Sequence, residues 1–383
     1  MMSPITSVSN HTVKSGSTTL KTITATKKDT TGYTTVFTSW STPTSGTITA
    51  NLTKTATFTR TEDTYSITYT LNGGSVSTAN PESYKVTTAS FTLNNPTKTG
   101  YTFKGWSGTG LTGDTNQTVT IAAGSTGNRT YTANWTANPY TIQFNKNAED
   151  ATGTMSNQSM TYDQAANLTA NAYTRTGYTF AGWAETATGD VVYDDEKEVT
   201  NLVATGTKIL YAKWTPNELV FGDKTINKTY STSSQTATVT AATNGTGSYT
   251  YEKVTSGSDA DITVASNGTI TIPATKNAGT YTVKIKATDT NSGATKTASY
   301  QIVIGKQTVN PVTNLAVSTA GVVTWTNSSN ATGYEISIDG TTWTSATSGV
   351  NYLSTIISAA GTRTVYVRAI NSDTTNYQTS STV

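Results

Sequence analysis

The chain has 383 residues and no cysteine, and its 25 Lys and Arg residues nearly balance 23 Asp and Glu residues, for a net charge of +2. These values exclude a disulfide scaffold and thiolate metal sites, and they give no reason to expect nucleic acid or an anionic membrane surface as a partner. No run approaches the ~18–20 apolar residues of a membrane span, so membrane insertion is not expected. Thr is the commonest residue, and 21 Tyr residues outnumber 7 Phe residues, which favours strands over helices.

Residues 1–62 are predicted to form a degenerate copy of a module that recurs later in the chain. The run from Gly32 to Trp40 has the pattern Gly-Tyr-x-Phe-x-Gly-Trp with two residues inserted and the second Gly replaced. Phe58 then stands where the later copies have a tryptophan. End modules of repeat arrays are often atypical, which fits this position in the chain.

Residues 63–137 are predicted to form a complete module. Alternating large and small polar residues predict a strand over 65–71, and the Asn72-Gly73-Gly74 run that follows supplies the positive φ angles of a turn. The full signature Gly-Tyr-x-Phe-x-Gly-Trp occupies residues 100–106. A second marker, Tyr-x-Ala-x-Trp, closes the module at residues 131–135.

Residues 138–216 repeat this plan. The signature returns at residues 177–183, and Tyr-Ala-Lys-Trp closes the module at residues 211–214. One stretch of this copy, Asp163–Leu168, is predicted to form a short helical turn.

The two complete copies, and loosely the first segment, resemble the Listeria–Bacteroides repeat, also called the internalin B repeat. The resemblance is carried by the double marker at nearly equal spacing and covers roughly residues 15–216. It implies small β-grasp-like modules arranged in tandem on secreted or wall-attached bacterial proteins, usually as a stalk or spacer. The family carries no catalytic residues, so the resemblance transfers none to this chain.

Residues 217–306 are predicted to form a β-sandwich of a different kind. Short alternating segments are separated by turns such as Asn244-Gly245 and Asn267-Gly268. The run from Ala278 to Asp289 is similar to bacterial immunoglobulin-like and cadherin-like surface domains.

Residues 307–383 resemble a fibronectin type III domain, which implies a second β-sandwich. Val322–Trp325 carries the core tryptophan of the second strand, and residues 334–338 lead into an Asp339-Gly340 hairpin turn. Residues 365–369 match the Tyr-x-Val-Arg strand of that family.

The tryptophans at repeated strand positions are predicted to be core residues. Each would bury on the order of 200 Å², a large share of a thin core. The predicted core tryptophans are Trp106, Trp135, Trp183, Trp214 and Trp325. Trp343 follows a hairpin turn and is instead predicted to be exposed, where its ring could stack on a sugar.

Few residues offer chemistry. His11 is the single histidine, so a metal site with two histidines is not possible. We expect His11 to be a solvated residue. Two acidic groups are candidates for Ca²⁺. The first is Asp194, Asp195, Glu196 and Glu198, for which a solvated loop is the favoured interpretation. The second is Asp259 and Asp261 with Asp289, which lack the calcium-binding motifs of true cadherins. A covalent cross-link of Lys224 or Lys284 with Asn291 is the weakest candidate. No catalytic residue, metal ligand or cofactor is predicted.

The sequence therefore predicts a mainly β, elongated chain of tandem β-grasp-like modules followed by two β-sandwich domains. The leading hypothesis is a non-catalytic stalk or spacer that projects an adhesive head from a bacterial surface protein. The alternatives are a module that binds a glycan or a host surface protein through the C-terminal sandwiches, and an accessory region of a secreted carbohydrate-active enzyme. An extracellular location is expected, although no signal peptide or wall anchor is visible in these residues.

Overall fold

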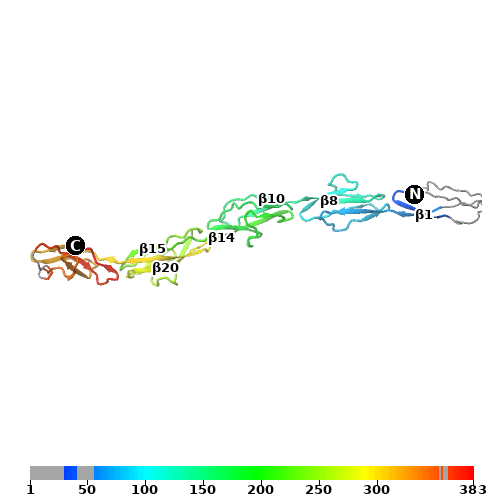
Figure 1. Ribbon diagram of the computed structural model, residues 1–383. Helices are drawn as coiled ribbons and strands as arrows, with labels where there is room; N and C mark the ends of the chain where they lie inside the picture. The colour runs from blue at the N-terminus through cyan, green and yellow to red at the C-terminus, as the bar shows by residue number, and fades with distance from the viewer. Residues whose placement is uncertain (1–29, 41–55, 353–354, 357–360) are drawn as a thin grey trace, which may run out of the picture. The chain divides into compact units, whose positions relative to one another are not determined.

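The computed structural model describes residues 30–40, 56–352, 355–356 and 361–383. Every regular element in these residues is a β-strand, so the mainly β prediction is confirmed (Figure 1). Among the same residues, none forms a helix of the length and apolarity needed to cross a membrane. The helical turn predicted over Asp163–Leu168 is wrong, because Ala166 and Asn167 form strand β11 instead.

The chain divides into two compact units whose ranges interleave within residues 138–216. The five-module division is finer than this and stays a prediction. The first unit comprises Met1–Asn145, Ser156–Ala170 and Asp195–Leu210, and the second comprises Lys146–Met155, Asn171–Asp194 and Tyr211–Val383.

The first unit begins, in the described residues, with an antiparallel pair. Strand β1 (Tyr33–Trp40) pairs with β2 (Ala56–Glu62), and a β-bulge interrupts the register between Phe37 and Ser39. The Tyr, Val, Phe and Thr residues of these two segments favour a pleated strand.

The first complete repeat is built on a four-stranded mixed sheet of order β4-β3-β8-β6. Its first and last strands, β3 and β8, run parallel, and the outer strands are antiparallel to them. The six strands of this repeat are β3 (Thr64–Thr70), β4 (Ser83–Lys85), β5 (Phe91–Thr92), β6 (Tyr101–Gly108), β7 (Thr120–Ile121) and β8 (Arg129–Ala137). The small β5–β7 sheet supplies Ile121 to a core centred on Trp106, Tyr131 and Ala133.

The second repeat has a sheet of the same order, β10-β9-β14-β12, and a small β11–β13 sheet. Its signature strand β12 is bulged between Phe180 and Gly182, at the same place as β6 between Phe103 and Gly105. Its strands are β9 (Pro139–Asn145), β10 (Gln158–Thr161), β11 (Ala166–Asn167), β12 (Tyr178–Ala184), β13 (Glu198–Val199) and β14 (Gly206–Pro216).

Residues 224–305 form two facing sheets, β15-β21-β20-β17 and β16-β19-β18. Long strands alternate buried and half-exposed residues, and Val283, Ile285 and Ala287 point into a core shared with Ile270 and Ile272 of the other sheet. The first strand, β15, runs parallel to the last, β21. The strands are β15 (Lys224–Thr229), β16 (Gln235–Thr238), β17 (Tyr249–Val254), β18 (Thr263–Val264), β19 (Thr269–Ile272), β20 (Gly279–Asp289) and β21 (Thr295–Gly305).

The C-terminal residues form another pair of sheets, β23-β24-β27 and β26-β25-β28. Val323 from one sheet and Ile336 and Val367 from the other share one core. A parallel pair again joins the first strand, β22, to the last, β29. The strands are β22 (Gln307–Thr308), β23 (Thr313–Val317), β24 (Val322–Thr326), β25 (Gly333–Ser337), β26 (Thr344–Ala346), β27 (Val350–Asn351), β28 (Tyr366–Ile370) and β29 (Tyr377–Gln378).

Candidate functional sites

The signature tryptophans lie inside the modules. Trp106 and Trp183 are 0% exposed and Trp325 is 7% exposed, whereas Trp135 and Trp214 are half-buried. The half-buried rings are held by their indole N–H groups. Trp135 donates to the carbonyl of Leu71 at 3.0 Å, and Trp214 to that of Lys146 at 2.9 Å.

A phenylalanine joins the two tryptophans of each complete repeat. The ring of Phe103 lies edge-on to Trp106 and to Trp135, with both centroid separations 5.5 Å. Phe180 repeats this with Trp183 at 4.9 Å and Trp214 at 5.7 Å. Edge-to-face geometry is the favoured one for aromatic pairs, so each signature forms a packed aromatic cluster.

The structure gathers no cation site from either acidic group. Asp194, Asp195, Glu196 and Glu198 are all exposed. Nowhere in the described part of the chain do three or more His, Asp or Glu side chains come together as metal ligands would. His11 lies outside the described residues.

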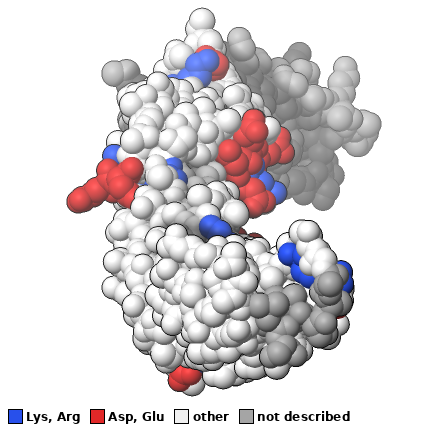
Figure 2. Space-filling view, turned by 90° about the vertical axis from the view of Figure 1, so that its left-hand side faces the viewer, with Lys and Arg blue, Asp and Glu red and all other residues white. Residues whose placement is uncertain are grey.

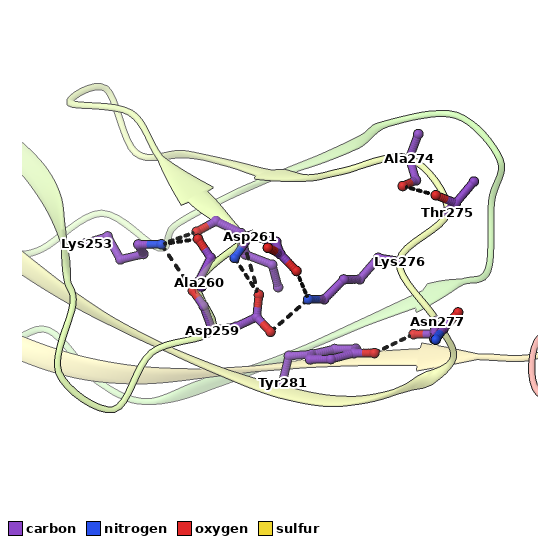
Figure 3. Close-up of polar contacts among 10 residues, drawn as sticks. Lys253, Asp259, Ala260, Asp261, Ala274, Thr275, Lys276, Asn277 and Tyr281 are labelled. Atoms are coloured by element: carbon purple, nitrogen blue, oxygen red, sulfur yellow. Dashed lines mark hydrogen bonds and ion pairs between the residues drawn. The ribbon is translucent and has the colours of Figure 1, made fainter.

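Lysine ammonium groups lie against the second acidic group, in the sandwich of residues 224–305 (Figure 3). Lys276 Nζ is 2.9 Å from Asp259 Oδ2 and 2.6 Å from Asp261 Oδ2. Lys253 Nζ donates to three backbone carbonyls, those of Asp259 (3.1 Å), Ala260 (3.0 Å) and Ile262 (2.8 Å). Two lysines from other segments of the same sandwich thus neutralise the charge of this loop.

The pKa values agree with a stable ion pair. Burial opposes the ionisation of Asp259, but the hydrogen bonds from Lys276 and from the N–H groups of Ile262 and Asp261 outweigh it and lower the pKa of Asp259. Burial also opposes the charge on Lys276, and its two aspartate partners nevertheless raise the pKa of Lys276. Because both groups are held in their charged forms, the pair is suited to fixing the loop around Asp259. A charged ammonium is also a poor nucleophile.

Asp289 belongs to a different turn. It is fully buried and accepts hydrogen bonds from the N–H groups of Asn291 (3.0 Å) and Ser292 (2.9 Å) and from the hydroxyl of Thr246 (2.7 Å). Burial alone would raise the pKa of Asp289, but these donors lower it to about 2.

The candidate cross-link partners are engaged elsewhere. Lys224 Nζ donates to Thr240 Oγ1 at 2.8 Å, and Lys284 lies against Gly257. Asn291 Nδ2 donates to Thr246 Oγ1 at 3.1 Å. The described contacts therefore do not pair either lysine with Asn291.

Trp343 is half-buried, and a cation lies over its ring. Arg368 Cζ is 4.1 Å from the ring centroid, and the same guanidinium binds Glu335 through Nε at 2.7 Å and Nη2 at 2.6 Å. The arginine fixes the ring by a cation–π contact. Trp343 is thus a preorganised surface aromatic.

Residues that the sequence reasoning missed lie where one module ends. The first residues of the signature, Gly100 and Thr102, bind Asn138, the residue directly after β8. Asn138 donates its backbone N–H to the Gly100 carbonyl at 2.9 Å and accepts the Thr102 hydroxyl at Oδ1 at 2.6 Å. No local pattern marks Asn138, because its role depends on the pairing of β6 with β8.

The same contacts recur at the second signature. Asn217 follows β14, donates its N–H to the Gly177 carbonyl at 2.9 Å and accepts the Thr179 hydroxyl at 2.7 Å. They recur once more at the N-terminal pair. Asp63 follows β2, donates to the Gly32 carbonyl at 3.1 Å and accepts the Thr34 hydroxyl at 2.6 Å.

Two segments of the chain match a protein-family model. Residues 65–134 and 140–213 match the Listeria-Bacteroides repeat domain, so the prediction of two such repeats is confirmed. The chain is also 34% identical over 123 residues to Internalin H of Listeria monocytogenes. That alignment covers 32% of this chain and 21% of Internalin H, so the chain spans about a fifth of that relative.

Two solved structures are distantly similar to this chain. A protocadherin gamma B7 fragment with extracellular cadherin domains 1–4 aligns at 10% identity and a TM-score of 0.27, over 70% of this chain and 80% of that one. BT4661, a SusE-like surface-located polysaccharide-binding protein of Bacteroides thetaiotaomicron, aligns at 12% identity and a TM-score of 0.20, over 73% of this chain and 53% of that one. Likenesses at this level carry no argument about function.

Proposed function

We propose that this chain is a non-catalytic spacer within a bacterial cell-surface or secreted protein, in which each domain serves to separate its neighbours. The observation that carries the proposal is the use of the signature residues. The residues that recur most regularly in the sequence have structural roles. Trp106 and Trp183 are buried in the module interior, and the carbonyls of Gly100 and Gly177 accept hydrogen bonds from the following linker. Such residues build a module and attach it to the next one.

The charged groups fit the same proposal. The face in Figure 2 shows Lys, Arg, Asp and Glu in small separate groups among uncharged residues. The best-formed ionic cluster, Lys276 with Asp259 and Asp261, is an internal brace. The match of residues 65–134 and 140–213 to a surface-protein repeat supports an extracellular place for the chain.

Small-angle scattering tests the spacer function. A single globule of this length has a radius of gyration of about 21 Å, whereas a spacer of separate domains has a value at least about half as large again. A radius near the globular value would overturn the proposal, because the domains would then be folded back on one another.

A second candidate function, recognition of a glycan, is favoured by Trp343. Its half-exposed ring is held in place by Arg368 and Glu335, and a rigid aromatic surface is what stacking on a sugar requires. A glycan array with the wild-type chain and with Trp343→Ala tests this. A signal lost in the variant supports it, and no signal from either chain ends it.

A further inference from the structure

We propose that the Gly-Tyr-Thr start of each signature, together with the Asp or Asn after the module's last strand, is a coupling site that fixes the orientation of the domain that follows. The inference goes beyond the spacer function, because an adhesive or enzymatic protein would use the same coupling. Its partner is the next domain of the same chain, whether or not that domain is a repeat.

The first step is that the polar contacts are placed by strand register. In each pair, the signature tyrosine faces the last residue of the closing strand: Tyr33 faces Glu62, Tyr101 faces Ala137 and Tyr178 faces Pro216. The Asp or Asn is the next residue in every case. The ladder therefore continues by one backbone hydrogen bond and one side-chain hydrogen bond into the linker, and the linker loses its freedom to rotate.

The second step is that the signature glycine, which has no side chain, allows the next domain to pack closely against it. A Cβ on Gly100 would lie 2.3 Å from the ring of Tyr162, and a Cβ on Gly177 would lie 2.7 Å from the backbone of Thr246. Both glycines also have positive φ, 75° and 78°. Only glycine allows this approach without a shift of the neighbouring domain.

The third step is that the signature tyrosine binds the same neighbour. The Tyr101 hydroxyl donates to Asp163 Oδ2 at 2.5 Å, and its ring lies edge-on to Tyr162 at 5.7 Å. This bond is the leading cause of the lowered pKa of Asp163, which Asn201 also holds at 2.6 Å.

The second complete repeat couples to a domain of another kind. The Tyr178 hydroxyl donates to the carbonyl of Asn291 at 3.4 Å, in the turn that Asp289 organises. Asp289 also holds Thr246, the residue that meets Gly177. The signature end is thus constant, while the receiving end is built from Tyr162 and Asp163 in a repeat and from Thr246 and Asn291 in a sandwich.

A cation covers the tyrosine ring at all three places. Arg60 Cζ lies 3.4 Å from the centroid of Tyr33, Lys98 Nζ 3.7 Å from that of Tyr101 and Arg175 Cζ 3.8 Å from that of Tyr178. The cation comes from the tyrosine's own module, so the ring is oriented before the next domain arrives. Such preorganisation lowers the entropy lost on docking.

Spin-label distances in the full chain test the proposal. The chain has no cysteine, so two introduced cysteines are labelled uniquely. The pair Ala123→Cys with Asn157→Cys spans the junction at Gly100, between the two complete repeats. The pair Ala187→Cys with Ser266→Cys spans the junction at Gly177, between the second repeat and the sandwich. All four residues are exposed. Each pair is expected to give one narrow distance distribution in the otherwise wild-type chain.

Substitutions in the coupling site should broaden these distributions at least about twofold. Thr102→Val removes the hydroxyl and keeps the shape, and its control Thr92→Val removes an exposed hydroxyl that binds Thr120 on the small β5–β7 sheet. Asn217→Ala removes the acceptor, whereas Asn217→Asp keeps it, as Asp63 does naturally. Broadening with Thr102→Val and Asn217→Ala, and none with the two controls, supports the proposal.

A matched glycine pair separates the loss of the domain contact from the backbone strain of a side chain at positive φ. Gly100→Ala and Gly124→Ala both place a side chain at positive φ, but nothing lies within 4 Å of a Cβ on Gly124. A label pair inside the sandwich, Thr232→Cys with Ser266→Cys, must keep its width in the Asn217 variants. A second pair inside the first complete repeat, Ala89→Cys with Thr112→Cys, both exposed, must keep its width in the Thr102 and Gly100 variants. Unchanged widths within a domain show that its fold persists. Unchanged widths across both junctions in Thr102→Val, Asn217→Ala and Gly100→Ala would overturn the proposal.

Discussion

The N-terminal strand pair β1–β2 and the signature pair β6–β8 are the same arrangement at two lengths. Phe37 faces Phe58 as Phe103 faces Trp135, and the bulge comes directly after both phenylalanines. The N-terminal pair has two extra residues on each strand, Thr35 and Val36 opposite Arg60 and Thr59. Because side chains alternate with a period of two, equal insertions of two leave every later residue on its original face.

This comparison shows which part of the signature matters. Trp40 faces Ala56 as Trp106 faces Ala133 and as Trp183 faces Ala212, although the spacing from the tyrosine differs. The constant features are the register around the bulge and the coupling residues at the end. The degenerate module over residues 1–62 stays a prediction, and its residues 1–29 and 41–55 lie outside the described residues.

The largest expected difference between the two pairs is at the tryptophan. Trp106→Ala should lower the free energy of unfolding of its module by about 3–5 kcal/mol, because the ring is fully buried. Trp40→Ala should cost less than half of that, since Trp40 is only half-buried. Amide hydrogen exchange of β8 and β2 in the full chain measures both, and equal losses would break the comparison.

The residue after the bulge should give the next largest effect. Gly105 has φ 144°, and a Cβ there would lie 2.4 Å from the backbone nitrogen of Asn116, so Gly105→Ala should cost about 3 kcal/mol. Ser39 occupies the matching place in β1, where Ser39→Ala should be nearly neutral. Hydrogen exchange of the two pairs again provides the measurement, and a neutral Gly105→Ala would contradict the close approach of the Asn116 backbone to this position.

The third prediction concerns pH and the receiving end of the second coupling site. The pKa of Asp289 is about 2 in the fold, below the ordinary 3.8, so its stabilisation is complete above about pH 4 and is lost as the pH falls towards 2. The loss should be on the order of 2 kcal/mol. Asp289→Asn should remove this pH dependence, as followed by acid unfolding of residues 224–305. An unchanged acid transition in the variant would show that Asp289 is not its origin.

The smallest effect is expected from shortening the N-terminal pair. Deleting residues 35–36 together with 59–60 converts it to the length of β6–β8 and should keep Phe37 opposite Phe58. The cost should be about 0.5–1 kcal/mol, for the lost contact of Arg60 with Tyr33. Cross-strand nuclear Overhauser effects between residues 37 and 58 test the register. Deleting only residues 35–36 should abolish these effects, and their survival there would show that the register is not set by the insertions.

Local sequence patterns predicted the features that depend on neighbouring residues. The turn at Asn72-Gly73 is confirmed by φ angles of 51° and 83°. The two repeats were recognisable because their aromatic markers recur at fixed spacing. A helical turn was expected near Ala166 from local preference, but short helices are marginal alone and pairing with Val199 made this segment a strand.

Features that depend on distant residues were not predictable in the same way. The two lysines, Lys253 and Lys276, that occupy the Asp259 loop come from other segments of the sandwich. Trp343 directly precedes β26, and Arg368 contacts it from β28. Asn138 and Asn217 carry no local signal, since an asparagine after a strand is common, and only the strand register brings each one to a glycine carbonyl.

The parallel pairing of first and last strands has a mechanical consequence. In the repeat of residues 64–137, and in both sandwiches, the strand that enters the domain lies hydrogen-bonded and parallel to the strand that leaves it. Tension applied through the chain ends would pull such strands in opposite directions along their length. Their hydrogen bonds would then bear the load in shear and break together, not one at a time, so these thin domains are built to withstand stretching.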